Sequence, residues 1–280
     1  MNELSIKANQ IRRDALFSIY HAGSGHPGGA LSCADLLAYL FFAEGGKTKQ
    51  DRFILSKGHS CPILYAVLAE AGWIPKSSLI SLRKLGSPLQ GHPHVSVMPA
   101  VEASTGSLGQ GFSIAIGMAM GLRQQNDPSR VYVMLGDGEL QEGEVWEGAM
   151  CAAQFELDKL CAIVDYNKIQ SDDFNDNIIG LEPLRAKWEA FGWLVVEIDG
   201  HDFEQIDAAF ITAKSSSCKP VVIIAHTVKG QGVSYMAGVP AWHGSVKLRA
   251  EELQQALRDL GTEEDRIPAY LDGSIWSERS

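Results

Sequence analysis

The sequence predicts an α/β protein, with a doubly wound, mostly parallel β-sheet and helices on both faces of that sheet. Short and almost wholly apolar segments recur along the chain, and segments with apolar residues at helical spacing separate them. Strands buried on both faces form continuous apolar runs, and their alternation with helices is typical of a parallel sheet. The 280 residues are 45% hydrophobic and 21% charged, enough to bury a full core. With no linker-like segment in sight, we expect residues 1–280 to form a single domain.

The chain begins with a predicted amphipathic helix. Its first 23 residues alternate charged and apolar residues at helical spacing and lack the apolar core of a signal peptide. A second helical pattern, Leu31–Phe42, precedes the first apolar run, Arg52–Leu55, which we predict as a strand. Helical spacing returns in Pro62–Ala71 and in Gly109–Gln124, and we expect glycine-rich loops around them.

The rest of the chain alternates between strand and helix. The predicted elements, in order, are the strand Val131–Leu135, the helix Val145–Phe155, the strands Leu160–Asp165 and Trp193–Ile198, the helix Phe203–Ala213, the strand Val221–Ala225 and a closing helix Lys247–Leu260. In sheets of this kind, ligands bind outside the carboxyl ends of the strands. The polar loops that follow the strands are therefore the predicted site.

Charge and cysteine content restrict the partners and the compartment. Lys and Arg number 24 and Asp and Glu 34, so the net charge is −10, which argues against nucleic acid and anionic membranes as partners. No apolar stretch is long enough for a transmembrane helix. The five cysteines include no CxxC pair, which favours free thiols and a cytoplasmic protein.

A pair of strand ends predicts a metal site. Asp137 follows one predicted strand directly, between Gly136 and Gly138, and Asn167 follows the next strand 30 positions later. That spacing suits one strand–helix–strand unit, so both side chains are expected to leave neighbouring strand ends together. Carboxylate, amide and carbonyl oxygens are hard ligands suited to Mg²⁺ or Ca²⁺, with diphosphate oxygens completing the shell.

These residues also carry a family resemblance. Gly136-Asp137-Gly138, then 28 residues, then Asn167 resembles the motif of thiamine diphosphate-dependent enzymes. Further segments, in the same order and over about residues 12–245, are similar to the N-terminal, diphosphate-binding domain of transketolase. They are Ser24–Gly28, Leu55–His59, Gly91–Pro93, Thr105–Gly111, Asp199–Asp202, the segment with Thr227, Lys229 and Gly230, and Trp242–Gly244. The resemblance implies the thiamine diphosphate-binding fold, with thiamine diphosphate and Mg²⁺ (or Ca²⁺) as cofactors.

The resemblance implies a role for each matching residue near the cofactor. Asp137, Asn167 and the carbonyl of Ile169 resemble the metal ligands, and Gly138 and His59 resemble residues at the cofactor diphosphate.

A loop and an acidic residue complete the implied cofactor site. Gly106, Ser107 and Leu108 match a Gly-Pro-Leu segment along the cofactor near its aminopyrimidine end, with Ser107 in place of the usual proline. Glu142, with Glu147, matches a pair of acids at the dimer interface, where Glu142 belongs to a carboxylate network that links two active sites.

Three histidines are the implied catalytic residues. His26, His92 and His243 resemble histidines that surround the hydroxyl and carbonyl oxygens of the donor sugar. Each stands next to a glycine, and histidines in glycine-flanked loops are not typical of core filling. Imidazoles suit proton transfer to and from sugar oxygens near neutral pH.

The implied activity is transfer of a two-carbon ketol unit from a ketose (phosphate) to an aldose (phosphate), as in the pentose phosphate pathway. The pyrimidine-binding and C-terminal domains of a transketolase do not occur in these 280 residues. We therefore expect a separately encoded C-terminal subunit, sugar phosphate substrates and an α2β2 heterotetramer. Two alternatives stay open: a subunit of another thiamine diphosphate enzyme, such as a 2-oxo-acid dehydrogenase α subunit or a deoxyxylulose-phosphate synthase, and a non-catalytic cofactor-binding paralogue.

Overall fold

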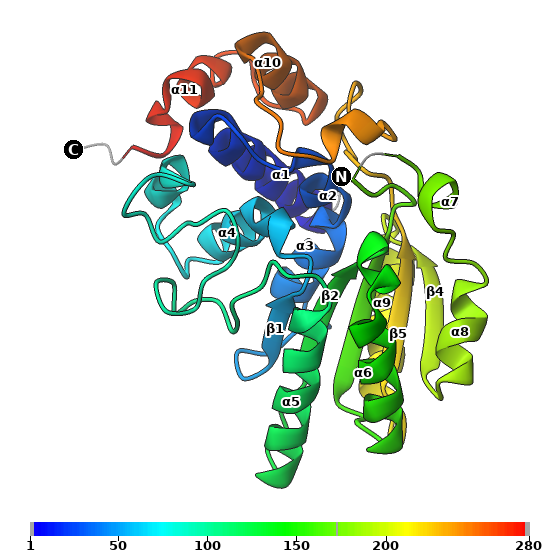
Figure 1. Cartoon of the computed structure of the whole chain (residues 1–280). Coiled ribbons are helices and arrows are strands. Elements are labelled where there is room, and N and C mark those ends of the chain that lie inside the picture. Colours follow the sequence, from blue (N-terminus) through cyan, green and yellow to red (C-terminus); the bar gives the residue numbers. More distant parts are fainter. Residues whose placement is uncertain (1–2, 172, 278–280) are drawn as a thin grey trace.

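Five parallel strands form one sheet at the centre of the molecule (Figure 1). The structure is a computed structural model that describes residues 3–171 and 173–277. The sheet order is β1-β2-β3-β5-β4. After β3 the chain passes to the edge strand β4, and β5 then fills the position between β3 and β4. The strands are β1 (Arg52–Leu55), β2 (Val131–Gly136), β3 (Leu160–Tyr166), β4 (Leu194–Asp199) and β5 (Val221–His226). All five predicted strands are confirmed, and so is the α/β fold class.

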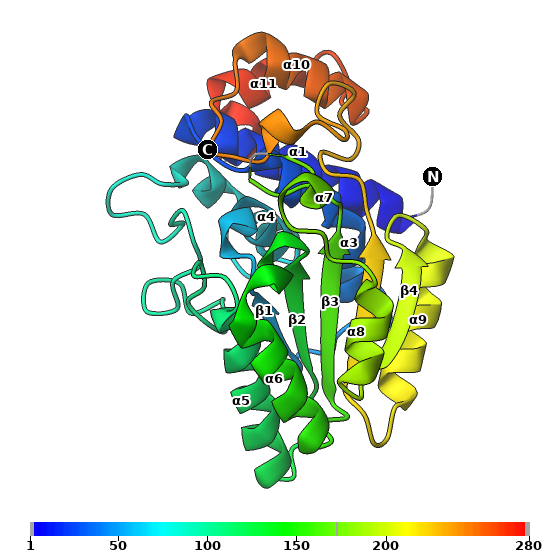
Figure 2. The ribbon, with the colours of Figure 1, turned by 45° about the vertical axis from the view of Figure 1, so that its right-hand side comes forward.

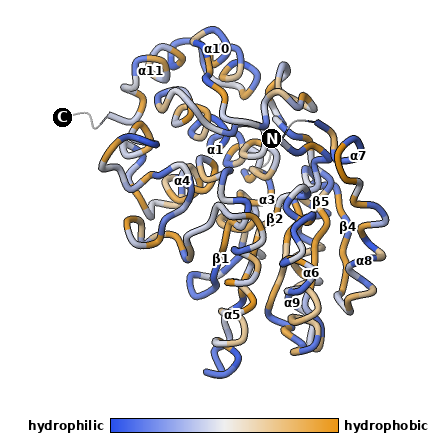
Figure 3. The backbone as a smooth tube through the Cα atoms, in the orientation of Figure 1, coloured by the Kyte–Doolittle hydropathy of each residue, from blue (hydrophilic) through white to orange (hydrophobic). Residues whose placement is uncertain are grey.

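Helices cover both faces of the sheet, as predicted (Figures 1 and 2). On one face, alternate strand residues such as Val133 and Val164 pack against α5 (Gln110–Gln124), α6 (Gly143–Gln154) and α8 (Leu184–Ala190). On the other face, the intervening strand residues pack into a second, larger core with the remaining long helices. These helices are α1 (Glu3–Ala22), α3 (Ala34–Phe42), α4 (Cys61–Glu70), α9 (Phe203–Ser215) and α10 (Ala250–Asp259). Figure 3 shows the strands as apolar along their length, which is the pattern from which they were predicted.

One predicted helix is wrong in its extent. The segment predicted as Leu31–Phe42 is two helices, α2 (Pro27–Ser32) and α3, because Cys33 leaves the helical conformation, with φ −94° and ψ 8°. Pro27 begins α2, where its missing N–H and fixed φ are tolerated. Ser32, the last residue of α2, donates from its hydroxyl to Asp165 at 2.6 Å.

In the described part of the chain, three short α-helices lie outside the predicted elements. They are α7 (Asn175–Ile178), α8 and α11 (Ile267–Asp272), each too short to show a helical period in the sequence. Met1 and Asn2 of the predicted first helix lie outside the described residues, and α1 begins at Glu3. Among the described helices, none has both the length and the apolar character needed to span a membrane.

Candidate active site

A cavity of about 410 Å³ opens at the carboxyl ends of β2 and β3. The walls come from the loops after β1, β2, β3 and β5, from α2, from the Gly106–Leu108 loop and from the segment around His243. Of the residues predicted for the site, all but His92 and Ser107 line it: His26, His59, Gly106, Leu108, Asp137, Gly138, Glu142, Asn167, Ile169 and His243. Residues far apart in the sequence thus meet in one place.

The pairing of β2 with β3 brings Asp137 and Asn167 to the same sheet edge. Gly136 on β2 pairs in register with Asp165 on β3. Asp137 and Asn167 come shortly after these last paired positions. The Asn167 side-chain amide donates to Asp165 Oδ2 at 3.0 Å, which leaves its Oδ1 as an acceptor toward the Ile169 N–H. The residues that carry the predicted metal ligands are therefore held at the paired ends of β2 and β3.

Asp137 is buried and forms no ion pair with any residue that the structure describes. Its oxygens accept from the backbone N–H groups of Gly138 and Lys168, at 2.8 and 2.5 Å. Burial raises its pKa to about 6, and the charge of Lys229 partly opposes the rise. In the described part of the chain no cluster of three His, Cys, Asp or Glu side chains could hold a metal. Any cation here must use one carboxylate with neutral oxygens, which is a donor set that fits Mg²⁺ and leaves room for diphosphate oxygens.

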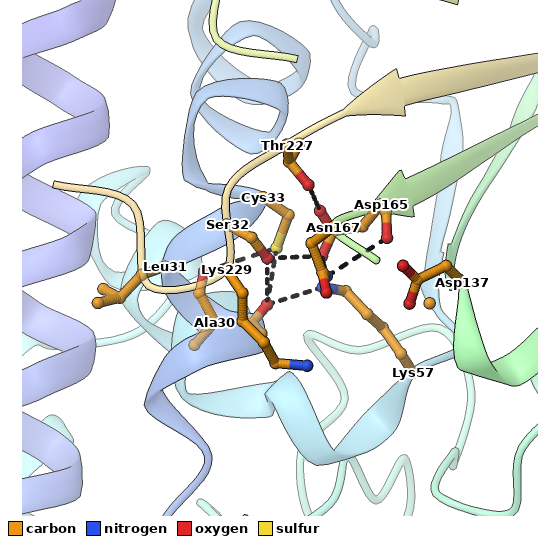
Figure 4. Close-up of polar contacts among 12 residues, drawn as sticks. Ala30, Leu31, Ser32, Cys33, Lys57, Asp137, Asp165, Asn167, Thr227 and Lys229 are labelled. Carbon is orange, nitrogen blue, oxygen red and sulfur yellow. Dashed lines mark hydrogen bonds and ion pairs between the residues drawn. The ribbon is translucent and has the colours of Figure 1, made fainter. Parts of the chain in front are cut away.

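Asp165 is a charged centre that the motif analysis did not single out. Fully buried, it accepts from Lys57 Nζ at 2.6 Å, from the Ser32 hydroxyl and from the Thr227 hydroxyl, in addition to Asn167 (Figure 4). Burial opposes its charge, but Lys57 holds the pKa of Asp165 below its usual value. Its position on β3, just before Asn167, is the signal that could have found it.

Two buried lysines are further lining residues to which the sequence analysis gave no role. Burial would lower the pKa of Lys57, but the carboxylate of Asp165 outweighs it and the pKa is raised. Lys229 donates from Nζ to the Ile169 carbonyl and to His243 Nδ1, both at 2.5 Å, and burial lowers its pKa to about 8. The Ile169 carbonyl has a second lone pair, so this bond does not remove it as a ligand. Two buried ammonium groups beside a cavity fit a phosphate-bearing cofactor.

Three of the predicted histidines form a cluster in the lining of the cavity. The ring centroids of His26 and His59 lie 5.3 Å apart, those of His59 and His243 5.3 Å, and those of His26 and His243 6.1 Å. An antiparallel bridge between Gly25 and Val246 joins the two segments that carry His26 and His243. This close approach needs local glycines that the sequence supplies.

Burial keeps these imidazoles neutral. Burial, together with neighbouring positive charges such as Lys229, lowers the pKa of His26 to about 4 and that of His243 to about 3. The pKa of His59 is also well below its usual value, first because of burial and then because of Lys57. Within the described residues, the buried Nδ1 of His26 has no hydrogen-bond partner.

His92 and Ser107 lie beside the cavity. His92 is exposed and packs against the Gly106 backbone, where a Cβ added to Gly106 would come within 2.9 Å of His92 Cδ2. Ser107 is exposed at the tip of its loop, and so is Glu142, which borders the cavity from the start of α6. These exposed residues are available to a partner chain.

A comparison with known protein families identifies the family to which this chain belongs. A family model described as "Transketolase, thiamine diphosphate binding domain" matches residues 4–271. The chain belongs to the transketolase family. Its matched domain is one that binds thiamine diphosphate, in agreement with the predicted cofactor.

Relatives in the transketolase family differ in length. An apulose-4-phosphate transketolase subunit of Phocaeicola vulgatus is 38% identical over 277 residues, which are 96% of this chain and 98% of that protein. The 6-deoxy-6-sulfo-D-fructose transketolase subunit SqwG of Clostridium sp. is 42% identical over 268 residues, 93% of this chain and 97% of that protein. Human transketolase is 40% identical over 267 residues, 92% of this chain but 42% of that protein.

Solved transketolase structures share the fold. The crystal structure of transketolase from Campylobacter jejuni superposes with a TM-score of 0.86 at 30% identity, covering 98% of this chain and 47% of that one. Transketolase from Leishmania mexicana gives a TM-score of 0.86 at 31% identity, with 98% and 45% covered. The chain thus spans about half the length of these transketolases.

Proposed function

We propose that the chain is the N-terminal subunit of a transketolase. With a separately encoded C-terminal subunit, it transfers a two-carbon ketol unit from a ketose (phosphate) to an aldose (phosphate), using thiamine diphosphate and Mg²⁺ or Ca²⁺. The observation that carries the proposal is one cavity with two unlike walls. One wall holds the buried oxygen ligands, the two lysines and His59, and the other holds the neutral imidazoles of His26 and His243, with the Lys229–His243 bond joining the two.

The first wall would hold the cofactor by its charged end. Asp137, the Oδ1 of Asn167 and the Ile169 carbonyl would bind the metal, while Gly138 allows close approach of a diphosphate. His59, together with Lys57 and Lys229, would donate to phosphate oxygens. Removing water from this pocket strengthens each of these interactions. Thiamine diphosphate, when bound, supplies the nucleophilic carbon that carries the two-carbon unit.

The second wall would handle the sugar. The neutral ring of His26 can accept a proton from a sugar hydroxyl and return it to a carbonyl oxygen, while His243, close to it, can donate a hydrogen bond to a sugar oxygen. The Lys229 ammonium donates to His243 Nδ1, so the proton of that neutral ring is on Nε2. His92 would contact the sugar from the rim. Gly106, Ser107 and Leu108 would lie along the cofactor.

The partner completes the site in this proposal. We assign the whole chain to the diphosphate-binding domain, and the pyrimidine-binding and C-terminal domains to the partner. Two relatives of similar length are named as transketolase subunits, which supports a two-chain enzyme. We propose an α2β2 heterotetramer, with Glu142 and Glu147 exposed for its interface. The free thiols of all five cysteines support a cytoplasmic location.

Ketol transfer by the two purified chains tests the proposal. The assay uses xylulose 5-phosphate, apulose 4-phosphate or 6-deoxy-6-sulfo-D-fructose as donor and ribose 5-phosphate as acceptor, since relatives are named for two of these sugars. We expect transfer with at least one donor, and a loss of about 10²-fold in the His26→Ala variant with cofactor affinity retained. Full cofactor occupancy without transfer from any donor would contradict the proposal. Decarboxylation of pyruvate would instead indicate another class of thiamine diphosphate enzyme.

A further inference from the structure

Glu139 is a buried carboxylate that none of the roles above explains. It lies in the loop after β2, is 2% exposed and borders the cavity. Its Oε1 accepts from the Ser56 hydroxyl at 2.5 Å and from the Gly109 N–H at 2.9 Å. Its Oε2 accepts from the Gly136 N–H at 3.0 Å. One side chain therefore joins the ends of β1 and β2 to the loop that precedes α5.

Gly109 is where this loop becomes a helix. It is the N-cap of the 15-residue helix α5 and has φ 87°, so its N–H points out of the helix start. The first turn of α5 is tight against β1, because a Cβ on Gly111 would lie 2.6 Å from the Cα of Ser56. The position of this turn is thus fixed by direct packing and by Glu139.

The Gly106–Leu108 loop is held at both of its ends. On one side, the hydroxyl of Thr105 donates to the Leu55 carbonyl at 2.7 Å. On the other side, Gly109 is bonded to Glu139. The loop between these anchors borders the cavity through Gly106 and Leu108, and its tip is exposed.

We propose that Glu139 is a positioning residue whose carboxylate fixes the Gly106–Leu108 loop against the ends of β1 and β2, and so sets the cavity wall against which the cofactor binds. The first step depends only on contacts within this chain. The second step rests on the proposed function, because it requires that the cavity takes thiamine diphosphate.

The three donors make the carboxylate hard to replace. Glutamine has the same shape but offers one acceptor oxygen and one NH₂ group. In one orientation its NH₂ group faces the Gly136 N–H. In the other orientation the NH₂ group faces the Ser56 hydroxyl and the Gly109 N–H. A buried donor without an acceptor is destabilising, and here the loss falls on the loop. Glu144→Gln is the matched control, because Glu144, in α6, accepts an exposed bond at Oε2 from the side chain of Gln110, the residue that follows Gly109.

Amide hydrogen exchange of residues 105–112 tests the first step on the chain without cofactor. We expect exchange at Gly109 to be about tenfold faster in Glu139→Gln and unchanged within about twofold in Glu144→Gln, while the amides of β5 keep their protection in both. If Glu139→Gln does not fold, Ser56→Ala removes one of the three donors and should give a smaller change in the same direction. Unchanged exchange at Gly109 in the variant that folds would overturn the proposal.

Calorimetric titration of the two-chain complex with thiamine diphosphate and Mg²⁺ tests the second step. We expect Glu139→Gln to weaken cofactor binding by about tenfold and Glu144→Gln to leave it unchanged. If Glu139→Gln shows faster exchange in the loop but binds the cofactor with wild-type affinity, the proposed effect of the loop on the cofactor-binding wall of the cavity is wrong. A wild-type complex that binds no cofactor would refute the proposed function, and the exchange result would still decide the role of Glu139 in the loop.

Discussion

Replacing Asp165 with asparagine should destabilise the folded chain by about 3–5 kcal/mol, because it leaves Lys57 as a buried charge without its partner. Both side chains are at most 2% exposed and their charged atoms lie 2.6 Å apart. Unfolding entropy scales at about 2.1 cal/mol/K per residue, which for 280 residues is about 0.6 kcal/mol/K. A loss of about 4 kcal/mol therefore corresponds to a fall in Tm of about 7 °C.

Thermal and urea unfolding of the purified chain measure this effect. Arg258→Met is the matched control: it breaks the exposed pair with Glu264 at 2.8 Å, and surface pairs contribute about 0–1 kcal/mol. The double variant Lys57→Met with Asp165→Asn removes both charges and should recover part of the loss. The reasoning is wrong if Asp165→Asn changes stability no more than Arg258→Met does.

Other predictions concern pH, packing and the loop that carries Lys229. Burial raises the pKa of Asp14 from 3.8 to about 7, so the folded chain binds this proton more tightly than the unfolded chain and loses stability as pH rises between those values. Asp14→Asn should therefore raise stability at pH 8 by up to about 4 kcal/mol and flatten its pH dependence, and a less stable variant in urea titrations would contradict this. Gly111→Ala should lower Tm clearly, because its Cβ meets backbone atoms at 2.6 Å, and an unchanged melting curve would refute the packing. His201 accepts the Val228 N–H at 2.9 Å, so His201→Phe should speed amide exchange at Val228 by about tenfold, and wild-type protection there would exclude this role.

The sequence was most informative where burial and topology act together. Strands such as Val221–Ala225 are continuous apolar runs because both sheet faces are covered, and each was found within one or two residues of its ends. The meeting of Asp137 with Asn167 followed from parallel pairing of consecutive strands, which the register of Gly136 with Asp165 confirms.

What the sequence could not show depends on contacts between distant segments. Lysine is rarely buried, so nothing local marks Lys57 or Lys229 as interior residues. Each becomes buried because of partners far along the chain, at Asp165 and at the Ile169 carbonyl. The hydrogen bond from Ser32 to Asp165 on β3 likewise joins residues that are far apart in the sequence. Polar networks of this kind are set by tertiary structure rather than by local pattern.

Binding of thiamine diphosphate with Mg²⁺, measured by calorimetric titration of this chain alone and with its partner subunit, tests the central claim most directly. The account predicts that binding appears or tightens strongly when the partner is present, and that Asp137→Ala abolishes it. Absence of binding under both conditions, with both chains folded, would contradict the assignment of this cavity as the cofactor site.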